Sequence, residues 1–136
     1  MRIVMDTDVI LKAFFFGGPA RRILEFVIRD KLPAFATPEI VAEYEAAVAK
    51  LAAKKKATLR PNLLLPLTTR LHMVGPKPRP ALCRHPGDDK FLACALDARA
   101  IYIVAGFRDL RRTEEGNRVS MMTAGGLGQA LGLCEL

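Results

Sequence analysis

The sequence lacks the features that identify membrane, secreted and zinc-binding proteins. No apolar stretch reaches the roughly 18 residues that a membrane span requires. Asp6 and Asp8 interrupt the apolar N-terminus, so we expect no signal peptide and, by default, a cytoplasmic protein. The chain has 3 cysteines and 2 histidines, with no C-x-x-C pair. This usage disfavours a structural zinc site, and disulfides are not expected in a reducing compartment.

Acidic residues are also scarce relative to basic ones. The 136 residues contain 21 Lys and Arg against 14 Asp and Glu, a net charge of +7. Each basic cluster taken alone is typical of a solvated face, but together they would also suit a polyanion or an acidic protein partner. The clusters are Arg21-Arg22, Lys54-Lys55-Lys56, residues 77–84, and Arg108 with Arg111 and Arg112.

The hydrophobic pattern alternates between short apolar runs and longer helical stretches. This alternation predicts an α/β protein, a single domain over residues 1–136 with a mostly parallel central sheet covered on both faces. The expected strands are residues 2–6, 33–37, 72–74, 101–104 and 119–122. The expected helices are residues 8–15, 20–29 and 38–56, a broken helix over 59–71, a helix that opens at Asp88 and a last helix to Leu133. Proline-rich and basic loops are expected over residues 75–87 and 105–117.

Several helix starts have recognisable caps. Thr37 is placed to cap a helix with Pro38 at its first position. Thr123 is placed to cap the last helix. For the helix over residues 8–15, Asp8 or Thr7 is the expected cap.

Three acids fall at corresponding places in this pattern. Asp6 ends the first strand, Glu43 borders the apolar stripe of the helix from Pro38, and Asp88 opens a later helix. In a parallel α/β fold these positions face one edge, where ligands bind. Converging carboxylates repel one another unless a cation neutralises them, and Mg²⁺ or Mn²⁺ prefers oxygen ligands. Beside a basic rim, this predicts metal-assisted hydrolysis of a phosphodiester.

Each acid also has an ordinary structural explanation. Asp8 is explained as a cap, and Glu43 as a surface residue paired with Lys50 or another base. Asp88 or Asp89 is explained as a helix cap, where an anion is favourable. Asp6 is harder to explain, since no local cap requires it there.

The chain resembles the PIN-domain ribonucleases, most closely those regarded as toxins of toxin–antitoxin modules. The resemblance rests on residues 3–9, 37–43, 88–96 and 100–110, which read IVMDTDV, TPEIVAE, DDKFLACAL and AIYIVAGFRDL. It implies a three-layer α/β/α sandwich and cleavage of RNA with Mg²⁺ or Mn²⁺, leaving a 5′-phosphate. It further implies a cognate antitoxin and, by analogy alone, a homodimer.

The family's acids can be assigned along the chain. Its first acid falls on Asp6, its helix glutamate on Glu43, and its third acid on Asp88, with Asp89 as the fallback. We predict that these residues hold the metal and activate water.

Two positions depart from the family pattern. Asp8 stands where members usually have Asn, and Phe107 where they usually have a fourth acid, in the run Val104-Ala105-Gly106-Phe107. One hypothesis is that Asp8 compensates as a metal ligand and that one ion binds. The alternative is a degenerate PIN domain that binds RNA or a protein without cleavage. Asp109 is better explained as a residue that fixes the loop.

A third interpretation comes from different chemistry. The run Asp6-Thr7-Asp8 after a strand also resembles the start of haloacid-dehalogenase-type phosphatases, where the first Asp is a nucleophile. The late acidic motif of those enzymes should follow an apolar strand. Residues 77–86, which precede Asp88, are basic and proline-rich instead, so this interpretation is remote.

Overall fold

The computed structural model describes residues 1–55, 63–75, 77, 86–106 and 118–132. Within them five strands form one sheet in the order β3-β2-β1-β4-β5, and every neighbouring pair is parallel. The strands are β1 (Ile3–Met5), β2 (Ala34–Ala36), β3 (His72–Met73), β4 (Tyr102–Val104) and β5 (Ser120–Met122). The predicted parallel sheet is therefore confirmed.

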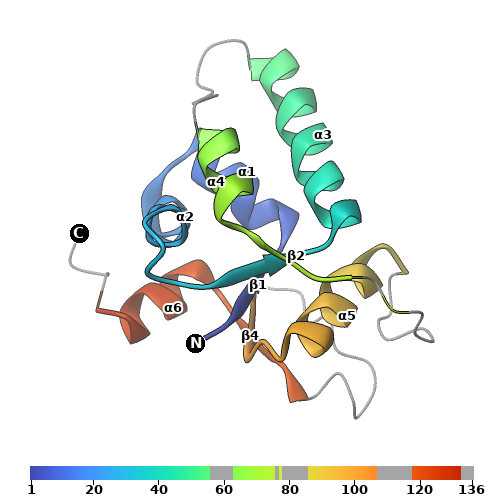
Figure 1. Cartoon of the computed structure of the whole chain (residues 1–136). Coiled ribbons are helices and arrows are strands. Elements are labelled where there is room, and N and C mark those ends of the chain that lie inside the picture. Colours follow the sequence, from blue (N-terminus) through green and yellow to red (C-terminus); the bar gives the residue numbers. More distant parts are fainter. Residues whose placement is uncertain (56–62, 76, 78–85, 107–117, 133–136) are drawn as a thin grey trace.

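Helices cover both faces of this sheet (Figure 1). Helix α5 packs against β1, β2 and β4, whereas α2 packs against α1, α4 and α6. From β1 the chain adds β2 and then β3 on one side of the sheet, and it later adds β4 and β5 on the other side of β1. Because crossovers between parallel strands are right-handed, the connecting helices of the two halves lie on opposite faces of the sheet. This is the α/β/α sandwich that was predicted. The helices are α1 (Thr7–Phe15), α2 (Gly18–Ile28), α3 (Pro38–Lys55), α4 (Leu64–Arg70), the short η2 (Pro86–Asp88), α5 (Asp89–Ala98) and α6 (Ala124–Ala130).

The core is continuous through the sheet. All three residues of β1 are buried, as expected for a central strand covered on both faces. Tyr44, Phe14 and Phe91 are the largest fully buried side chains and come from α3, α1 and α5. The core thus fixes these three helices, which carry the candidate acids, relative to the carboxyl end of β1.

Helix caps correct one prediction and match two. The cap of α1 is Asp6, whose carboxylate accepts a hydrogen bond from the Thr7 N–H; the prediction of Asp8 or Thr7 was wrong. Thr37 caps α3 by accepting from the Ile40 N–H at 3.2 Å. Thr123 caps α6. Asp6 is therefore a helix cap, a role that the sequence did not indicate. The apolar pattern assigned Asp6 to the end of the strand, whereas α1 begins at the next residue.

Glycine and proline shift two helix boundaries. Helix α2 starts at Gly18 rather than at residue 20, because Gly17 adopts a positive φ of 81° at the cap and Pro19 fits the first turn. Helix α4 accommodates Pro66 because this proline lies in the first turn, where the backbone N–H groups have no intrahelical partner. Helix α6 ends at Ala130, short of the predicted Leu133.

The predicted loops fall largely outside the described residues. Phe107 and Asp109 lie outside the described residues, and so do most of the basic clusters over residues 77–84 and 108–112. In the part of the chain that the structure describes, no helix is both long and apolar enough to cross a membrane.

Candidate metal and catalytic site

Asp6 lies where β1 gives way to α1 and is only 6% exposed. Its backbone N–H donates to Val104 O on the neighbouring β4 at 2.9 Å. Its carboxylate accepts from the Thr7 N–H at 2.7 Å. The strand pairing and the helix start together fix this side chain at the carboxyl edge of the sheet, where the sequence predicted it.

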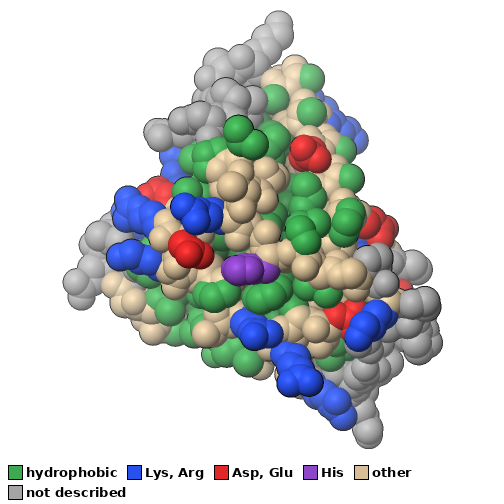
Figure 2. All heavy atoms as spheres, viewed as in Figure 1, with side chains coloured by type: hydrophobic (Ala, Val, Ile, Leu, Met, Phe, Trp, Pro, Cys, Tyr) green, Lys and Arg blue, Asp and Glu red, His purple; other side chains and the backbone are tan. Residues whose placement is uncertain are grey.

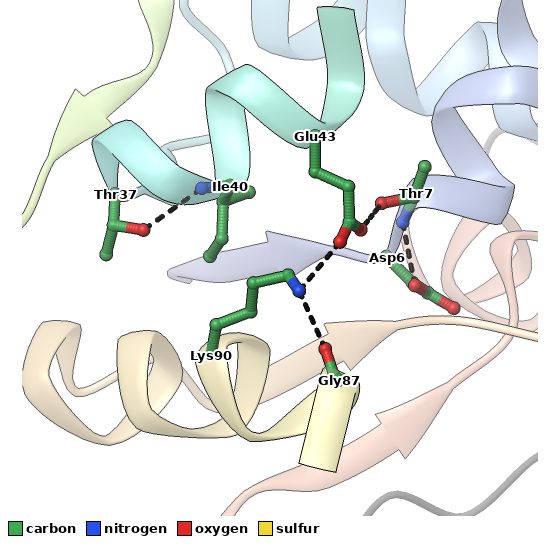
Figure 3. Close-up of polar contacts among 7 residues, drawn as sticks. All are labelled: Asp6, Thr7, Thr37, Ile40, Glu43, Gly87 and Lys90. Carbon is green, nitrogen blue, oxygen red and sulfur yellow. Dashed lines mark hydrogen bonds and ion pairs between the residues drawn. The ribbon is translucent and has the colours of Figure 1, made fainter. Parts of the chain in front are cut away.

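Glu43 comes to the same edge from α3. One of its oxygens, Oε2, accepts a hydrogen bond from the Thr7 hydroxyl, and the other, Oε1, lies 2.7 Å from Lys90 Nζ. Figure 3 shows these three side chains pointing toward one another from α3, α1 and α5. The expectation that Glu43 pairs with a base holds in kind, but the partner is Lys90 rather than Lys50.

Lys90 is a basic residue at this edge of the sheet. Its ammonium donates to Gly87 O at 2.8 Å as well as contacting Glu43. The side chain is 17% exposed, against 35% for Glu43. Lys90 belongs to the first turn of α5, where the helix dipole disfavours a positive charge. Its position therefore depends on the two oxygen partners.

The remaining predicted acids differ in burial. Asp88 is 7% exposed and precedes α5, but its side chain makes no capping hydrogen bond. Asp89, the fallback, is partly exposed in the first turn of the same helix, and Asp8 is exposed in the first turn of α1. Asp8 is thus the one predicted ligand that solvent reaches freely.

Tyr44 of α3 is fully buried next to Glu43 in the chain. Its hydroxyl donates to Met5 O at the end of β1. Burial raises the pKa of the Tyr44 phenol well above its usual value, and the neighbouring Cys94, Asp6 and Glu43 raise this pKa further. Tyr44 is therefore a neutral hydrogen-bond donor that anchors α3 to β1.

The acids suit a hard divalent cation by chemical type, since all their donors are carboxylate oxygens. Their present arrangement does not yet form a ligand cluster. Among the residues described, no three His, Cys, Asp or Glu side chains are gathered closely enough to hold an ion. Both oxygens of Glu43 are instead engaged by Thr7 and Lys90.

A pocket of about 360 Å³ opens at the same edge of the sheet, between α1, α2 and the start of α6. Among the described residues, its lining is mainly apolar and includes one cation, Lys12, but no carboxylate. This described lining shares no residue with the candidate acidic site. It consists of Val9, Lys12, Phe16, Gly17, Pro19, Ala20, Ala105, Gly106, Thr123, Ala124 and Gly125.

Sequence reasoning missed Thr7 and Lys90 as parts of this site. Lys90 carried a signal, because a lysine in the first turn of a helix opposes the dipole and needs a specific partner. Thr7 carried a weaker one, as a hydroxyl flanked by two acids. Neither signal identified Glu43 as the partner, since α3 lies far away in the sequence.

Comparison with known proteins identifies the family. A PIN domain model matches residues 2–108, so the chain belongs to the PIN-domain family. It is also 26% identical over 125 residues to an uncharacterised protein, MJ1680, of Methanocaldococcus jannaschii; the match covers 87% of this chain and 78% of that protein. No solved structure matches the chain significantly.

Family membership defines the general chemistry. PIN domains form a nuclease family and generally use divalent metal ions. Membership also leaves the phosphatase interpretation of Asp6-Thr7-Asp8 without support.

Proposed function

We propose that this protein is an endoribonuclease that hydrolyses RNA phosphodiester bonds with Mg²⁺ or Mn²⁺. The proposal rests on one observation: Thr7 links two acids that come from different elements. Its N–H donates to the Asp6 carboxylate at the end of β1, and its hydroxyl donates to Glu43 of α3. In a PIN domain, acids at this edge are suited to holding a divalent ion. The bound ion would supply an activated water at neutral pH.

Three acids have distinct parts in this proposal. Asp6 and Asp88 are buried and would supply ligand oxygens of fixed position. The burial of Asp88 favours it over the more exposed Asp89. Glu43, held by the Thr7 hydroxyl, would orient a ligand oxygen or accept a proton from water. Asp8 is exposed and would contribute only from the periphery of the site.

Basic side chains would hold the RNA backbone. Lys54 and Lys77 are exposed and suited to phosphate contacts. Figure 2 shows Lys and Arg side chains mostly toward the margins of the face in view, with hydrophobic side chains over much of its centre. Arg21 is not available for this purpose, because its guanidinium binds the carbonyls of Ala13 and Phe14.

The resemblance to toxins extends the proposal to a cognate antitoxin. A net charge of +7 is compatible with an acidic protein partner as well as with RNA. A homodimer is a prediction by analogy alone, and a cytoplasmic location is the default expectation from the N-terminal sequence. Co-expression of the chain with the product of an adjacent gene, followed by co-purification and a cleavage assay, tests the antitoxin prediction.

A nuclease assay tests the proposed activity. Purified protein is incubated with 5′-labelled and 3′-labelled RNA in Mn²⁺, in Mg²⁺ and in EDTA. We expect metal-dependent cleavage that leaves a 5′-phosphate and that disappears in Asp6→Asn. Lys31→Met, at the opposite edge of the sheet, serves as the control. Cleavage that persists in EDTA or in Asp6→Asn would refute the proposal.

The second candidate is a PIN domain that binds RNA or a protein without cleavage. The replacement of the family's fourth acid by Phe107 favours it. The same assay on Phe107→Asp separates the two candidates. An inactive parent chain and an active Phe107→Asp variant would favour the binding module, whereas activity in the parent chain favours the nuclease.

A further inference from the structure

A lysine ammonium contacts Glu43, one of the acids of the proposed metal site. Lys90 Nζ is 2.7 Å from Glu43 Oε1 and 2.8 Å from Gly87 O, the carbonyl next to Asp88 in the chain. Lys90 is also largely buried, with 17% of its side chain exposed. An ammonium has three donors, and two of them are committed to this edge. Lys90 is therefore part of the site and not of the solvated surface.

Among the described residues, no further contact accounts for a lysine at this place. The positive end of the α5 dipole repels a cation in the first turn. The Lys90 ammonium also lies 5.6 Å from the centre of the Phe91 ring, but Phe91 follows it directly in the chain and does not direct it toward α3. The attraction that holds it comes from Glu43 and from the Gly87 carbonyl.

The ammonium and a divalent ion need the same oxygen atoms. Glu43 Oε2 already accepts from Thr7, and Oε1 is bound by Lys90. The described acids form no ligand cluster in this arrangement, although their chemistry suits a hard cation. Two cations in contact with one carboxylate oxygen would repel each other strongly.

We propose that, among the described residues, Lys90 acts as a resident cation of this site in the metal-free protein, and that a divalent ion binds by displacing the Lys90 ammonium from Glu43. This inference rests on the proposed function and adds a residue that sets metal affinity. Lys90 would then lower the affinity of the site and keep the acids compatible with one another when no ion is present.

Two readouts other than catalysis test the inference: calorimetric titration with MnCl₂ and the melting temperature in EDTA. The variants are Lys90→Met, which removes the charge, and Lys90→Gln, which keeps a donor for Gly87 O if Lys90→Met folds poorly. Lys31→Met is the matched control. It removes the same charge from an exposed position before β2, at the opposite edge of the sheet.

We expect Lys90→Met and Lys90→Gln to bind Mn²⁺ about tenfold more tightly than the parent chain, because no ammonium–carboxylate bond must be broken first. Lys31→Met should bind as the parent does. In EDTA, both Lys90 variants should melt at a lower temperature than Lys31→Met, and saturating Mn²⁺ should remove this difference.

The outcomes separate this inference from the proposed function. Unchanged or weaker Mn²⁺ binding in both Lys90 variants would overturn the inference while leaving the metal site intact. Equal melting temperatures in EDTA for the Lys90 and Lys31 variants would overturn the resident-cation role. If the parent chain and all variants fail to bind Mn²⁺ or Mg²⁺, the proposed function and this inference both fall.

Discussion

Asp6 can be replaced in two ways that separate its role at the start of α1 from its proposed role as a metal ligand. Its carboxylate accepts from the Thr7 N–H at 2.7 Å. In Asp6→Asn the side-chain oxygen can still accept this hydrogen bond, but the negative charge is lost. In Asp6→Ala both the hydrogen bond and the charge are lost.

The unfolding free energies of the two variants should differ by the contribution of the capping hydrogen bond to Thr7. Loss of an N-cap side chain costs about 1 kcal/mol of unfolding free energy, with a range of about 0.5–2. Loss of the charge at a helix N-terminus costs about 0.3–1 kcal/mol in both variants. We therefore expect Asp6→Ala to unfold about 1 kcal/mol more easily than Asp6→Asn. For a chain of this size, the difference corresponds to about 3–4 °C in melting temperature.

The same two variants should be indistinguishable in metal binding. If Asp6 is a ligand, both lose Mn²⁺ binding by calorimetry and both lose RNA cleavage. Thr123→Ala is the control, because it removes the cap of α6, where Thr123 Oγ1 accepts from the Gly126 N–H at 3.0 Å. That variant should be destabilised but should still bind Mn²⁺.

Either half of the reasoning can fail separately. If Asp6→Asn is destabilised as much as Asp6→Ala, the hydrogen bond to Thr7 does not stabilise α1 as argued. If Asp6→Asn keeps Mn²⁺ binding and cleavage, Asp6 is a helix cap and not a ligand.

Three further predictions concern residues around the site. Tyr44→Phe should lower the unfolding free energy by about 1–2 kcal/mol in urea denaturation, because it leaves a buried carbonyl of β1 without its donor; an unchanged midpoint would contradict this. Thr37→Ala should cost about 1 kcal/mol through loss of the α3 cap, which the same denaturation measures. Burial, with a smaller contribution from a nearby carboxylate, raises the pKa of the Cys94 thiol to about 12. In a chain with Cys83→Ser and Cys134→Ser, native Cys94 should resist thiol reagents at pH 8. Stability should also fall as pH rises above about 8.5, since the thiolate then forms only in the unfolded chain.

The sequence was most informative where the determinants are local. Three-residue apolar runs and helical periodicity predicted the strands and most helices, and Thr37-Pro38 predicted the start of α3 to the residue. Asp6 was correctly placed at the carboxyl edge because strand and helix meet there. Its role as a cap was missed, since the helix begins one residue earlier than its apolar pattern indicates.

Contacts between distant segments could not be predicted in the same way. The pairing of Glu43 with Lys90 depends on how α3 and α5 pack, which in turn depends on the buried side chains of both helices. Sequence periodicity indicates which face of each helix is buried, but it does not indicate which polar residues at the border of that face will meet. The nearby Lys50 was therefore as reasonable a partner as Lys90.

The polar contacts of the site form one continuous chain that a metal ion would have to enter. It runs from the Asp6 carboxylate to the Thr7 N–H, from the Thr7 hydroxyl to Glu43, and from Glu43 through Lys90 to Gly87 O. Thr7 has a short, β-branched side chain with few rotamers, so releasing its hydroxyl from Glu43 gains little conformational entropy. Lys90 has a long side chain that regains rotamer freedom when it is released. The contact between Lys90 and Glu43 is therefore the one that an incoming cation breaks at the lowest cost.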